Sequence, residues 1–383
     1  MKIKHIIANV LSMPIRNREK RNLFRKAVSG FYLKDILSFF KFEKAEKKDK
    51  SILLVETNVT HGEVIAGYVK YFIDLGYQVD ILINSDILKE NPFCRLDLSE
   101  VRIFNSHYSM MYFFLKLKQL IRYKHIVLMT SAGYYTKTSK GYDTVFSFYK
   151  DIKKHPSLFV VEHDLIDVKR FEEEDLIKKN RLLTLGHLSQ GVFASPILFG
   201  DMKITPKNEI TTFITVGAIN SVRKNHQILI DSIKSLAQQN LKFKVLVVGL
   251  GALENLPIEV HPYIEILGRL DFPKMFEAVE NADFFLPLLD PNSQEHERYI
   301  TTGVTGSAQL IYAFSKVPVI HPKFAEFYGF DDSNALVIDD LQIGMKQAIE
   351  MDPLDYLEKQ QALTNLANAL KNETIENLKR IMG

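Results

Sequence analysis

The alternation of short apolar runs with amphipathic stretches constrains the fold of this chain more than any other feature. From Ser51 the sequence predicts a strand at 51–56, a helix that ends at Gly76 and a second strand at 78–83. Further short strands are predicted at 101–105, 125–129, 157–162 and 191–194, with helical stretches such as 108–121 between several of them. Strands that alternate with helices predict a parallel, doubly wound sheet with helices on both faces.

The same alternation begins again after Pro206. Strands are predicted at 210–217, 242–249, 263–268, 283–289 and 316–320, with helices at 224–239 and 273–282 and another that opens near Thr305. Because 383 residues are many for one hydrophobic core, we expect two Rossmann-like domains, at 51–205 and 206–350, and a helical tail at 351–383. Ligands of such folds bind at the carboxyl ends of the strands.

The first 50 residues form a basic extension. They hold 14 Lys and Arg against 5 Asp and Glu, whereas the rest of the chain holds 35 against 41. Apolar residues at helical spacing and several aromatic residues are interleaved with the basic ones, a pattern that suits the surface of an anionic membrane. Helices that pack on the body and turn their charges to water explain the pattern equally well. Residues 1–42 are therefore predicted to bind a membrane surface or to join the fold, and 43–50 read as a charged linker.

The composition and the missing motifs exclude several classes of protein. A single cysteine, Cys94, excludes an internal disulfide, argues against a cysteine-based metal cluster and favours a reducing compartment. No uncharged apolar run is long enough to span a membrane, and the confined basic charge argues against a nucleic-acid binder. No phosphate-binding P-loop is present. The stretch "VVGLGALENL" supplies Gly249 and Gly251 but has Glu254 where a dinucleotide fingerprint needs a small residue.

Two features of the second domain predict an anion site. Arg223 and Lys224 fall between a strand and a helix, and Thr305, Gly306 and Ser307 open another helix. Cations and free N–H groups at a helix N-terminus bind phosphates. A solvated Arg–Lys pair and an ordinary N-cap are the plainer explanations.

The order of these features resembles the nucleotide-sugar half of a GT-B glycosyltransferase. The residues that carry the resemblance are "FITVGAINSVRKNHQILIDSI", "KVLVVGLG", "IEILGRLDFPKMFEAVENADFFLPL" and "KVPVI". In the first domain, "THGEVIAGYVKYFIDLGYQVDIL" is similar to the first loop and helix of the family, and "LFVVEHDLID" to a strand that is followed by His-Asp. The resemblance covers about residues 51–350 and rests on the whole order of elements.

The resemblance implies where a nucleotide-sugar donor binds. Arg223 and Lys224 match the basic pair that contacts the diphosphate, so no metal cofactor is required and a UDP-sugar is the expected co-substrate. Gly268 and Arg269 match the segment around the base. A polar loop is a candidate for contacts with the donor sugar, and it contains Glu295, His296, Glu297 and Arg298. The predicted donor-binding set is Gly217, Arg223, Lys224, Gly249, Gly268, Arg269, Glu297, Thr305, Gly306 and Ser307.

The chain departs from the family just before strand 316–320. Many retaining members carry two glutamates eight positions apart there, and the corresponding residues of this chain are Gly303 and Ile311. Hydroxyl groups and a glycine, at Thr305, Gly306 and Ser307, occupy the same segment. These residues suit a phosphate better than a sugar.

The resemblance places the acceptor against the first domain. An inverting transfer needs a base that takes the proton of the acceptor hydroxyl. His61 and Glu63 follow the first strand, and His163 and Asp164 follow the strand at 157–162. Glu63 is the candidate base if the enzyme inverts, and His163 with Asp164 is the leading candidate for the catalytic site.

These observations predict a bacterial-type glycosyltransferase that moves a sugar to a lipid-linked or cell-surface glycan, such as a surface polysaccharide or lipopolysaccharide. Its basic extension would hold it at the cytoplasmic face of the membrane. One alternative is a sugar-nucleotide 2-epimerase of the same fold, which would consume its donor without an acceptor. Another is a non-catalytic, membrane-attached scaffold with a degenerate donor site, whose partner binding would survive the loss of Arg223 and Lys224.

Overall fold

The computed structural model divides into two compact units, and each is described separately. One unit comprises Met1–Glu162, Val168–Leu183 and Ile381–Gly383, and the other comprises His163–Asp167 and Thr184–Arg380. The predicted boundaries at residues 50, 205 and 350 stay predictions. The structure describes residues 6, 9–10, 12–18, 21–22, 25, 33–46, 48–58, 62–106, 114–115, 117–129, 152, 154–166, 168–173, 175–218, 224–251, 253 and 256–383.

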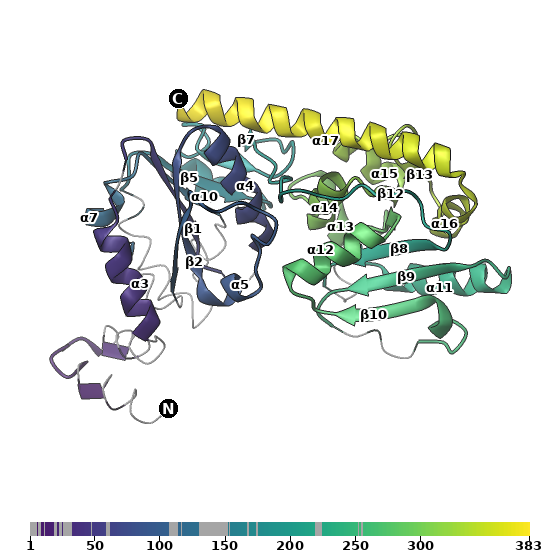
Figure 1. Cartoon of the computed structure of the whole chain (residues 1–383), viewed down its shortest axis with the longest axis horizontal. Helices are drawn as coiled ribbons and strands as arrows, with labels where there is room; N and C mark the ends of the chain where they lie inside the picture. Colours follow the sequence, from purple (N-terminus) through teal and green to yellow (C-terminus); the bar gives the residue numbers. More distant parts are fainter. Residues whose placement is uncertain are drawn as a thin grey trace. The chain divides into compact units, whose positions relative to one another are not determined.

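A seven-stranded sheet forms the centre of the first unit, in the order β3-β2-β1-β4-β5-β6-β7. Strands β1 to β5 pair in parallel, and β1, β2 and β5 are labelled in Figure 1. Every residue of β1, β4 and β5 is buried, which explains why these strands read as unbroken apolar runs. The strands are β1 (Ser51–Glu56), β2 (Gln78–Asn84), β3 (Arg102–Ser106), β4 (His125–Leu128), β5 (Leu158–Glu162), β6 (Leu182–Thr184) and β7 (Val192–Phe193).

Helix α4 (Gly62–Asp74) ends where the sequence predicted. Gly76 has φ +75°, and its N–H donates to the carbonyl of Ile73 at 2.8 Å. The next N–H, of Tyr77, donates to Phe72 at 3.0 Å. A glycine in the left-handed region closes a helix in this way because it has no Cβ to clash. The other short helices of this unit are α5 (Ser85–Lys89), α7 (Leu117–Leu120) and α10 (Val168–Glu173).

Helix α3 (Leu33–Lys44), from the basic extension, packs beside β3. The side chain of Phe42 is 1% exposed, and its ring lies 5.0 Å from that of Phe104 and 5.4 Å from that of Phe114. This part of the extension therefore joins the fold. Among the described residues, no helix is both long and apolar enough to cross a membrane.

A six-stranded parallel sheet forms the centre of the second unit, in the order β10-β9-β8-β11-β12-β13 (Figure 1). The strands are β8 (Thr211–Val216), β9 (Phe243–Val248), β10 (Ile264–Gly268), β11 (Phe284–Phe285), β12 (Val317–Ile320) and β13 (Leu336–Val337). The longer helices are α11 (His226–Gln238), α12 (Phe272–Asn281), α14 (Gly306–Phe314), α16 (Leu341–Glu350) and α17 (Pro353–Met382). Apolar faces of α11 and α16 meet the sheet in one core, which includes Leu229, Ile233, Phe213, Phe284 and Met345.

The connections of this sheet run in opposite directions from its middle. After β8 the chain passes through α11 to β9 and then to β10, whereas after β11 it passes through α14 to β12 and then to β13. The topological switch point therefore lies between β8 and β11. In open parallel sheets, ligands bind outside the carboxyl ends of the strands at such a point.

Strand β11 is shorter than the run 283–289 that the sequence predicted. The ladder stops after Leu286, whose N–H donates to Ile214 at 2.8 Å. Pro287 has no N–H to continue it, and Leu288 turns the backbone away with φ +55°. A positive φ is uncommon for a bulky residue and marks segments that their surroundings hold in place.

Two further predictions concern helices. The tail is helical as expected, since α17 extends over Pro353–Met382 with Tyr356 and Leu363 buried. In the stretch 108–121, α7 covers only Leu117–Leu120, and residues 107–113 and 116 lie outside the described part of the chain.

The sequence analysis missed strands β6 and β13, because two or three residues are too few to show a period.

Candidate functional site

Three adjacent strands of the second unit end on glycines that lie side by side. The N–H of Gly217 donates to Val248 at 2.9 Å, and that of Gly249 donates to Gly268 at 2.9 Å. A Cβ at Gly249 would lie 1.6 Å from the carbonyl oxygen of Gly217, and one at Gly217 would lie 2.9 Å from Cε of Lys224. Gly249 therefore needs glycine because a Cβ would overlap the backbone, Gly217 has a φ of +141° that favours glycine, and the stem of Lys224 fills the space beside Gly217.

Lys224 crosses the switch point of the sheet. Its Nζ donates to the carbonyl of Pro287 at 2.9 Å and to Oγ of Ser307 at 3.2 Å. The lysine follows β8, Pro287 follows β11, and Ser307 lies in the first turn of α14. The side chain is 5% exposed, and both of these partners are neutral. The ammonium group is thus held by dipoles at the topological switch point, where open parallel sheets bind ligands.

Burial dominates the electrostatics around this lysine. It lowers the pKa of Lys224 from its ordinary value of 10.5 to about 7. The neighbouring His226 is 7% exposed, and burial, with the charge of Lys224 second, lowers its pKa to about 4. His226 is therefore neutral near pH 7. An anion that reaches Lys224 would stabilise its charged form.

The first turn of α14 borders the lysine. Thr305 is the N-cap, and its hydroxyl accepts from the N–H of Ser307 at 3.3 Å, as the plainer reading of this segment predicted. Ser307 is 4% exposed, and its hydroxyl oxygen accepts the hydrogen bond from the ammonium group of Lys224. A Cβ at Gly306 would meet nothing within 4 Å, so open space lies in front of this turn. The N–H of Thr305 donates to the hydroxyl of Tyr328 at 3.1 Å, which fixes the start of the helix.

Backbone contacts join His163 and Asp164 to the segment that leads into α14. Asp164 forms an antiparallel bridge with Gly303. The N–H of Val304 donates to the carbonyl of His163 at 2.8 Å. A carboxylate oxygen of Asp164 lies 3.3 Å from the guanidinium of Arg298, and the two side chains are 13% and 25% exposed. Two predicted groups that are far apart in sequence, 163–164 and 305–307, are therefore joined within one unit.

The other predicted site residues are placed as follows. Arg269 is exposed after β10, beside Gly268, which has φ +66° and open space at its Cβ position. Glu297 is exposed on the short helix α13 (Gln294–Glu297), and Glu63 is half-buried in the first turn of α4. His61 and Arg223 lie outside the described residues.

The polar loop after β11 contains one candidate residue whose side chain is buried. His296, a candidate reader of the sugar, is 0% exposed, and its Nδ1 accepts from the N–H of Asp290 at 2.8 Å. The side chain of Asp290 accepts from the amide of Asn225 at 2.8 Å, next to Lys224. His296 therefore shapes the loop around the lysine, a role that only the fold reveals.

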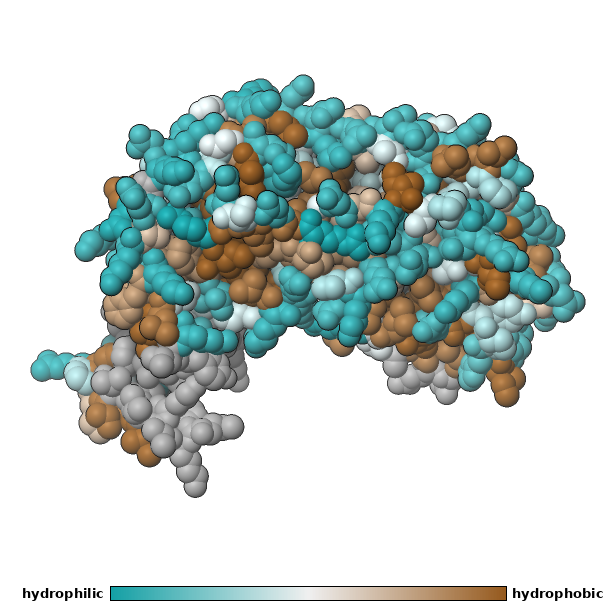
Figure 2. Space-filling view, viewed as in Figure 1, coloured by the Kyte–Doolittle hydropathy of each residue, from teal (hydrophilic) through white to brown (hydrophobic). Residues whose placement is uncertain are grey.

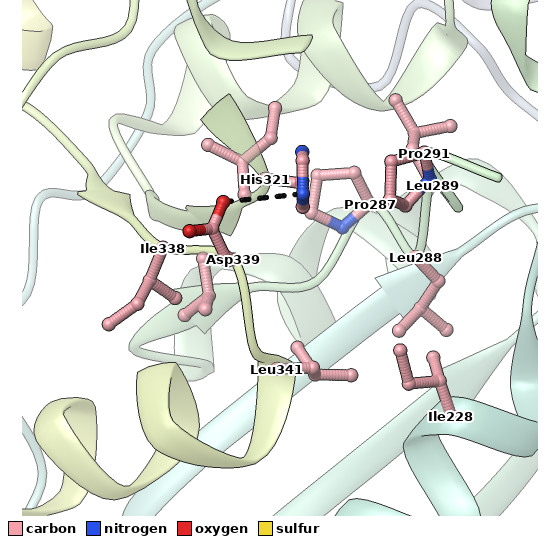
Figure 3. Close-up of a pocket in the computed structure, with 11 residues that line it drawn as sticks. Ile228, Pro287, Leu288, Leu289, Pro291, His321, Ile338, Asp339 and Leu341 are labelled. Carbon is pink, nitrogen blue, oxygen red and sulfur yellow. Dashed lines mark ion pairs between the residues drawn. The ribbon is translucent and has the colours of Figure 1, made fainter. Parts of the chain in front are cut away.

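A pocket opens beside the same loop, where β11, β12 and β13 end (Figure 3). Pro287 and Leu288 form part of its wall, so it shares a boundary with the Lys224 site. His321 and Asp339 lie at one side as an ion pair with 3.4 Å between Nε2 and Oδ1 (Figure 3). The rest of the wall is mostly apolar and includes Ile228, Pro291, Ile338 and Leu341. No cluster of three or more metal-ligating side chains occurs among the residues that the structure describes.

Comparison with known proteins supports the fold. The sequence matches no family model and no curated protein. The structure is similar to a glycosyltransferase from Rickettsia africae, with a TM-score of 0.53 and 12% identity over 88% of this chain and 98% of the other. It is also similar to S. aureus TarM in complex with fondaparinux, alpha-GlcNAc-glycerol and UDP, with a TM-score of 0.55 and 10% identity over 87% and 100% of the two chains.

A third similar structure is the pneumococcal O-GlcNAc transferase GtfA in complex with UDP and GlcNAc. Its TM-score is 0.50 and its identity 10%, over 87% of this chain and 98% of the other. Together with the two parallel sheets, these likenesses confirm the predicted GT-B fold of two Rossmann-like domains.

Proposed function

We propose that this protein is a glycosyltransferase that moves a sugar from a nucleotide-sugar donor to a lipid-linked or cell-surface glycan. The observation that carries the proposal is Lys224, a buried lysine with neutral partners at the switch point of the second sheet. A buried charge is costly unless it is paired. An anionic ligand that pairs with the ammonium group would offset the cost of burying the charge of Lys224.

The donor diphosphate is the anion that the surroundings of Lys224 fit best. The first turn of α14 places the positive end of the helix dipole next to the ammonium, with open space at the Cβ position of Gly306. As the bond to the sugar breaks, negative charge builds on the leaving diphosphate, and a fixed cation in a dry site stabilises it. Lys224, with Arg223, would do this without a metal ion. UDP in the complexes of TarM and GtfA supports a UDP-sugar as the donor.

The acceptor would be activated by a group from the predicted catalytic set. Glu63 is the proposed base for an inverting reaction, because a half-buried carboxylate can take a hydroxyl proton. His163 is the proposed partner at the sugar. Asp164 would act on it indirectly, since its own carboxylate is paired with Arg298 and accepts from the N–H of Ile166 at 3.0 Å.

A location at the cytoplasmic face of a membrane would bring this enzyme to a lipid-linked acceptor. The excess of basic residues in the first 50 positions supports this location, since each adds attraction to an anionic surface.

The direct test combines donor turnover with a matched pair of lysine variants. Lys224→Met should weaken UDP binding by roughly 100-fold and reduce sugar transfer at least as much, because it removes the buried cation. Lys316→Met is the control. Lys316 is also buried, but its Nζ donates to the carbonyl of Glu280 at 2.7 Å, before β11 begins.

Turnover of a panel of sugar nucleotides, followed with and without a glycan acceptor, identifies the reaction. Transfer that needs the acceptor supports the proposal. Donor consumption without acceptor indicates an epimerase, and equal UDP affinity of the wild type, Lys224→Met and Lys316→Met contradicts the donor site.

A further inference from the structure

Helix α3 presents an apolar and basic face to the outside. The exposed positions along the helix are Lys34, Leu37, Phe40, Lys41 and Lys44. Leu37 is 55% exposed and Phe40 is 54% exposed, so the two side chains form an apolar pair on the outward face of the helix. In the view of Figure 2, hydrophobic side chains reach the surface over α3 at the left of the molecule.

The orientation of α3 is fixed by its opposite face. Phe42 is 1% exposed among aromatic rings, and the ring of Phe39 lies 5.3 Å from that of Phe114. At the end of the helix, the guanidinium of Arg122 donates to the carbonyl of Glu43 at 3.0 Å. The helix cannot turn Leu37 and Phe40 inward without exposing Phe42. Their exposure is therefore a property of the packed helix.

The charge of the outward face has one sign. The two carboxylates of α3 lie elsewhere, since Asp35 is 0% exposed and Glu43 is half-buried. Lys34, Lys41 and Lys44 flank the two apolar side chains. Apolar side chains that project between lysines are typical of helices that lie in the interface of an anionic bilayer.

A second helix of the same protein shows a different arrangement. On α17, Leu354 is 70% exposed and Leu357 is 51% exposed, at the same spacing as Leu37 and Phe40. Their exposed neighbours include Asp355 and Glu358. Anionic lipids would repel this face. The α17 pair is thus a matched comparison in which exposure is similar and the local charge is opposite.

We propose that the outward face of α3 seats the protein on an anionic lipid bilayer, with Leu37 and Phe40 in the interface and the three lysines at the headgroups. This inference rests on the proposed location of the enzyme at a membrane and names the element that makes the contact. It does not depend on the donor site.

Flotation of the full-length protein with lipid vesicles tests the inference. Vesicles that contain phosphatidylglycerol in phosphatidylcholine should bind the wild type, and pure phosphatidylcholine vesicles should bind it much less. L37S/F40S should lower the partition coefficient about tenfold or more, because two apolar anchors are lost. Replacing Lys34, Lys41 and Lys44 by Gln should weaken binding and its dependence on salt.

The control is L354S/L357S, which should float like the wild type. UDP binding and thermal unfolding of each variant show whether the site and the fold are intact, so loss of lipid binding is separable from failure of the proposed activity. Equal flotation of L37S/F40S and the wild type would overturn the inference. Self-association that is lost in L37S/F40S, without lipid binding by the wild type, would also overturn it, because the face would then bind a second copy.

Discussion

The carboxyl ends of the two sheets differ in their chemistry although both sheets are parallel. In the first unit, strands β1, β2 and β5 end on the buried polar residues Glu56, Asn84 and Glu162. Glu56 accepts from the N–H of Asn58 at 2.7 Å, and the amide of Asn84 donates to the carbonyl of Thr57 at 3.0 Å. In the second unit, three strands are followed by or end on glycines, and a lysine fills the space above one of them.

One fold class can thus carry different chemical groups at the same edge of a sheet. Carboxylates at the strand ends suit hydroxyl groups and proton transfer, whereas glycines and a buried cation suit a phosphate that must approach the backbone closely. In both units the parallel sheet brings the carboxyl ends of the strands to one edge. The residues at these ends then determine which chemical groups lie along that edge.

The largest effect is expected at Gly249. Gly249→Ala should destabilise the protein by about 3 kcal/mol or more, because its Cβ would overlap the carbonyl oxygen of Gly217. Gly306→Ala is the control and should stay within about 0.5 kcal/mol of the wild type, since a Cβ there meets nothing within 4 Å. Chemical denaturation measures both. Similar losses for the two variants would refute the role of close strand-end packing.

The stability of the unit should depend on the charge of Lys224. Between pH 7 and 10.5 the folded lysine holds fewer protons than the unfolded one, so this group makes stability rise with pH, by at most about 1.4 kcal/mol per pH unit. Lys224→Met lacks this slope. The variant should therefore be more stable than the wild type near pH 6, and the advantage should shrink towards pH 9.5.

Urea unfolding at several pH values measures that difference. A pH-independent gap between Lys224→Met and the wild type would show that the lysine is not desolvated in solution. If Lys224→Met is more stable than the wild type but no longer binds UDP, the buried lysine lowers the stability of the protein and is needed for binding.

On the first unit, Glu63→Gln should reduce kcat by roughly 100-fold if this residue is the base. UDP affinity should not change, because Glu63 belongs to the unit that does not contain Lys224. Asp86→Asn, at an exposed carboxylate after β2, is the control. Steady-state kinetics with saturating donor distinguishes them, and an unchanged kcat in Glu63→Gln would leave the base to another group.

The smallest effect is expected at Asp164. Asp164→Asn should cost about 1 kcal/mol, because the pair with Arg298 is partly buried. Asp175→Asn, in an exposed pair with Lys179, should cost almost nothing. Thermal unfolding compares the two variants. Equal stabilities would mean that the backbone bridge at Gly303 is enough to hold 163–164 in place.

The sequence predicted the elements of the fold well because their signals are local. Apolar runs marked the strands that are four residues or longer, and Gly76 marked the end of α4. Short strands such as β6 left no period, and β11 was overestimated because the apolar run 283–289 continues past Pro287, where the ladder ends and Leu288 turns the backbone towards Asn225. Thr305 was recognisable as an N-cap from its residue type, whereas the contact between Ser307 and Lys224 was not.

By itself, the sequence determined two parallel α/β halves, glycines at the strand ends and a basic extension. Periodicity, the positions of glycines and charge can each be recognised from residues that are close together in the sequence. Tertiary structure decided that Lys224 is buried, that it spans from β8 to Pro287, and that 163–164 joins the segment before α14. It also decided which side of α3 remains outside. These properties arise from contacts between residues distant in sequence, and burial, which no single residue encodes, sets the charge state of the lysine.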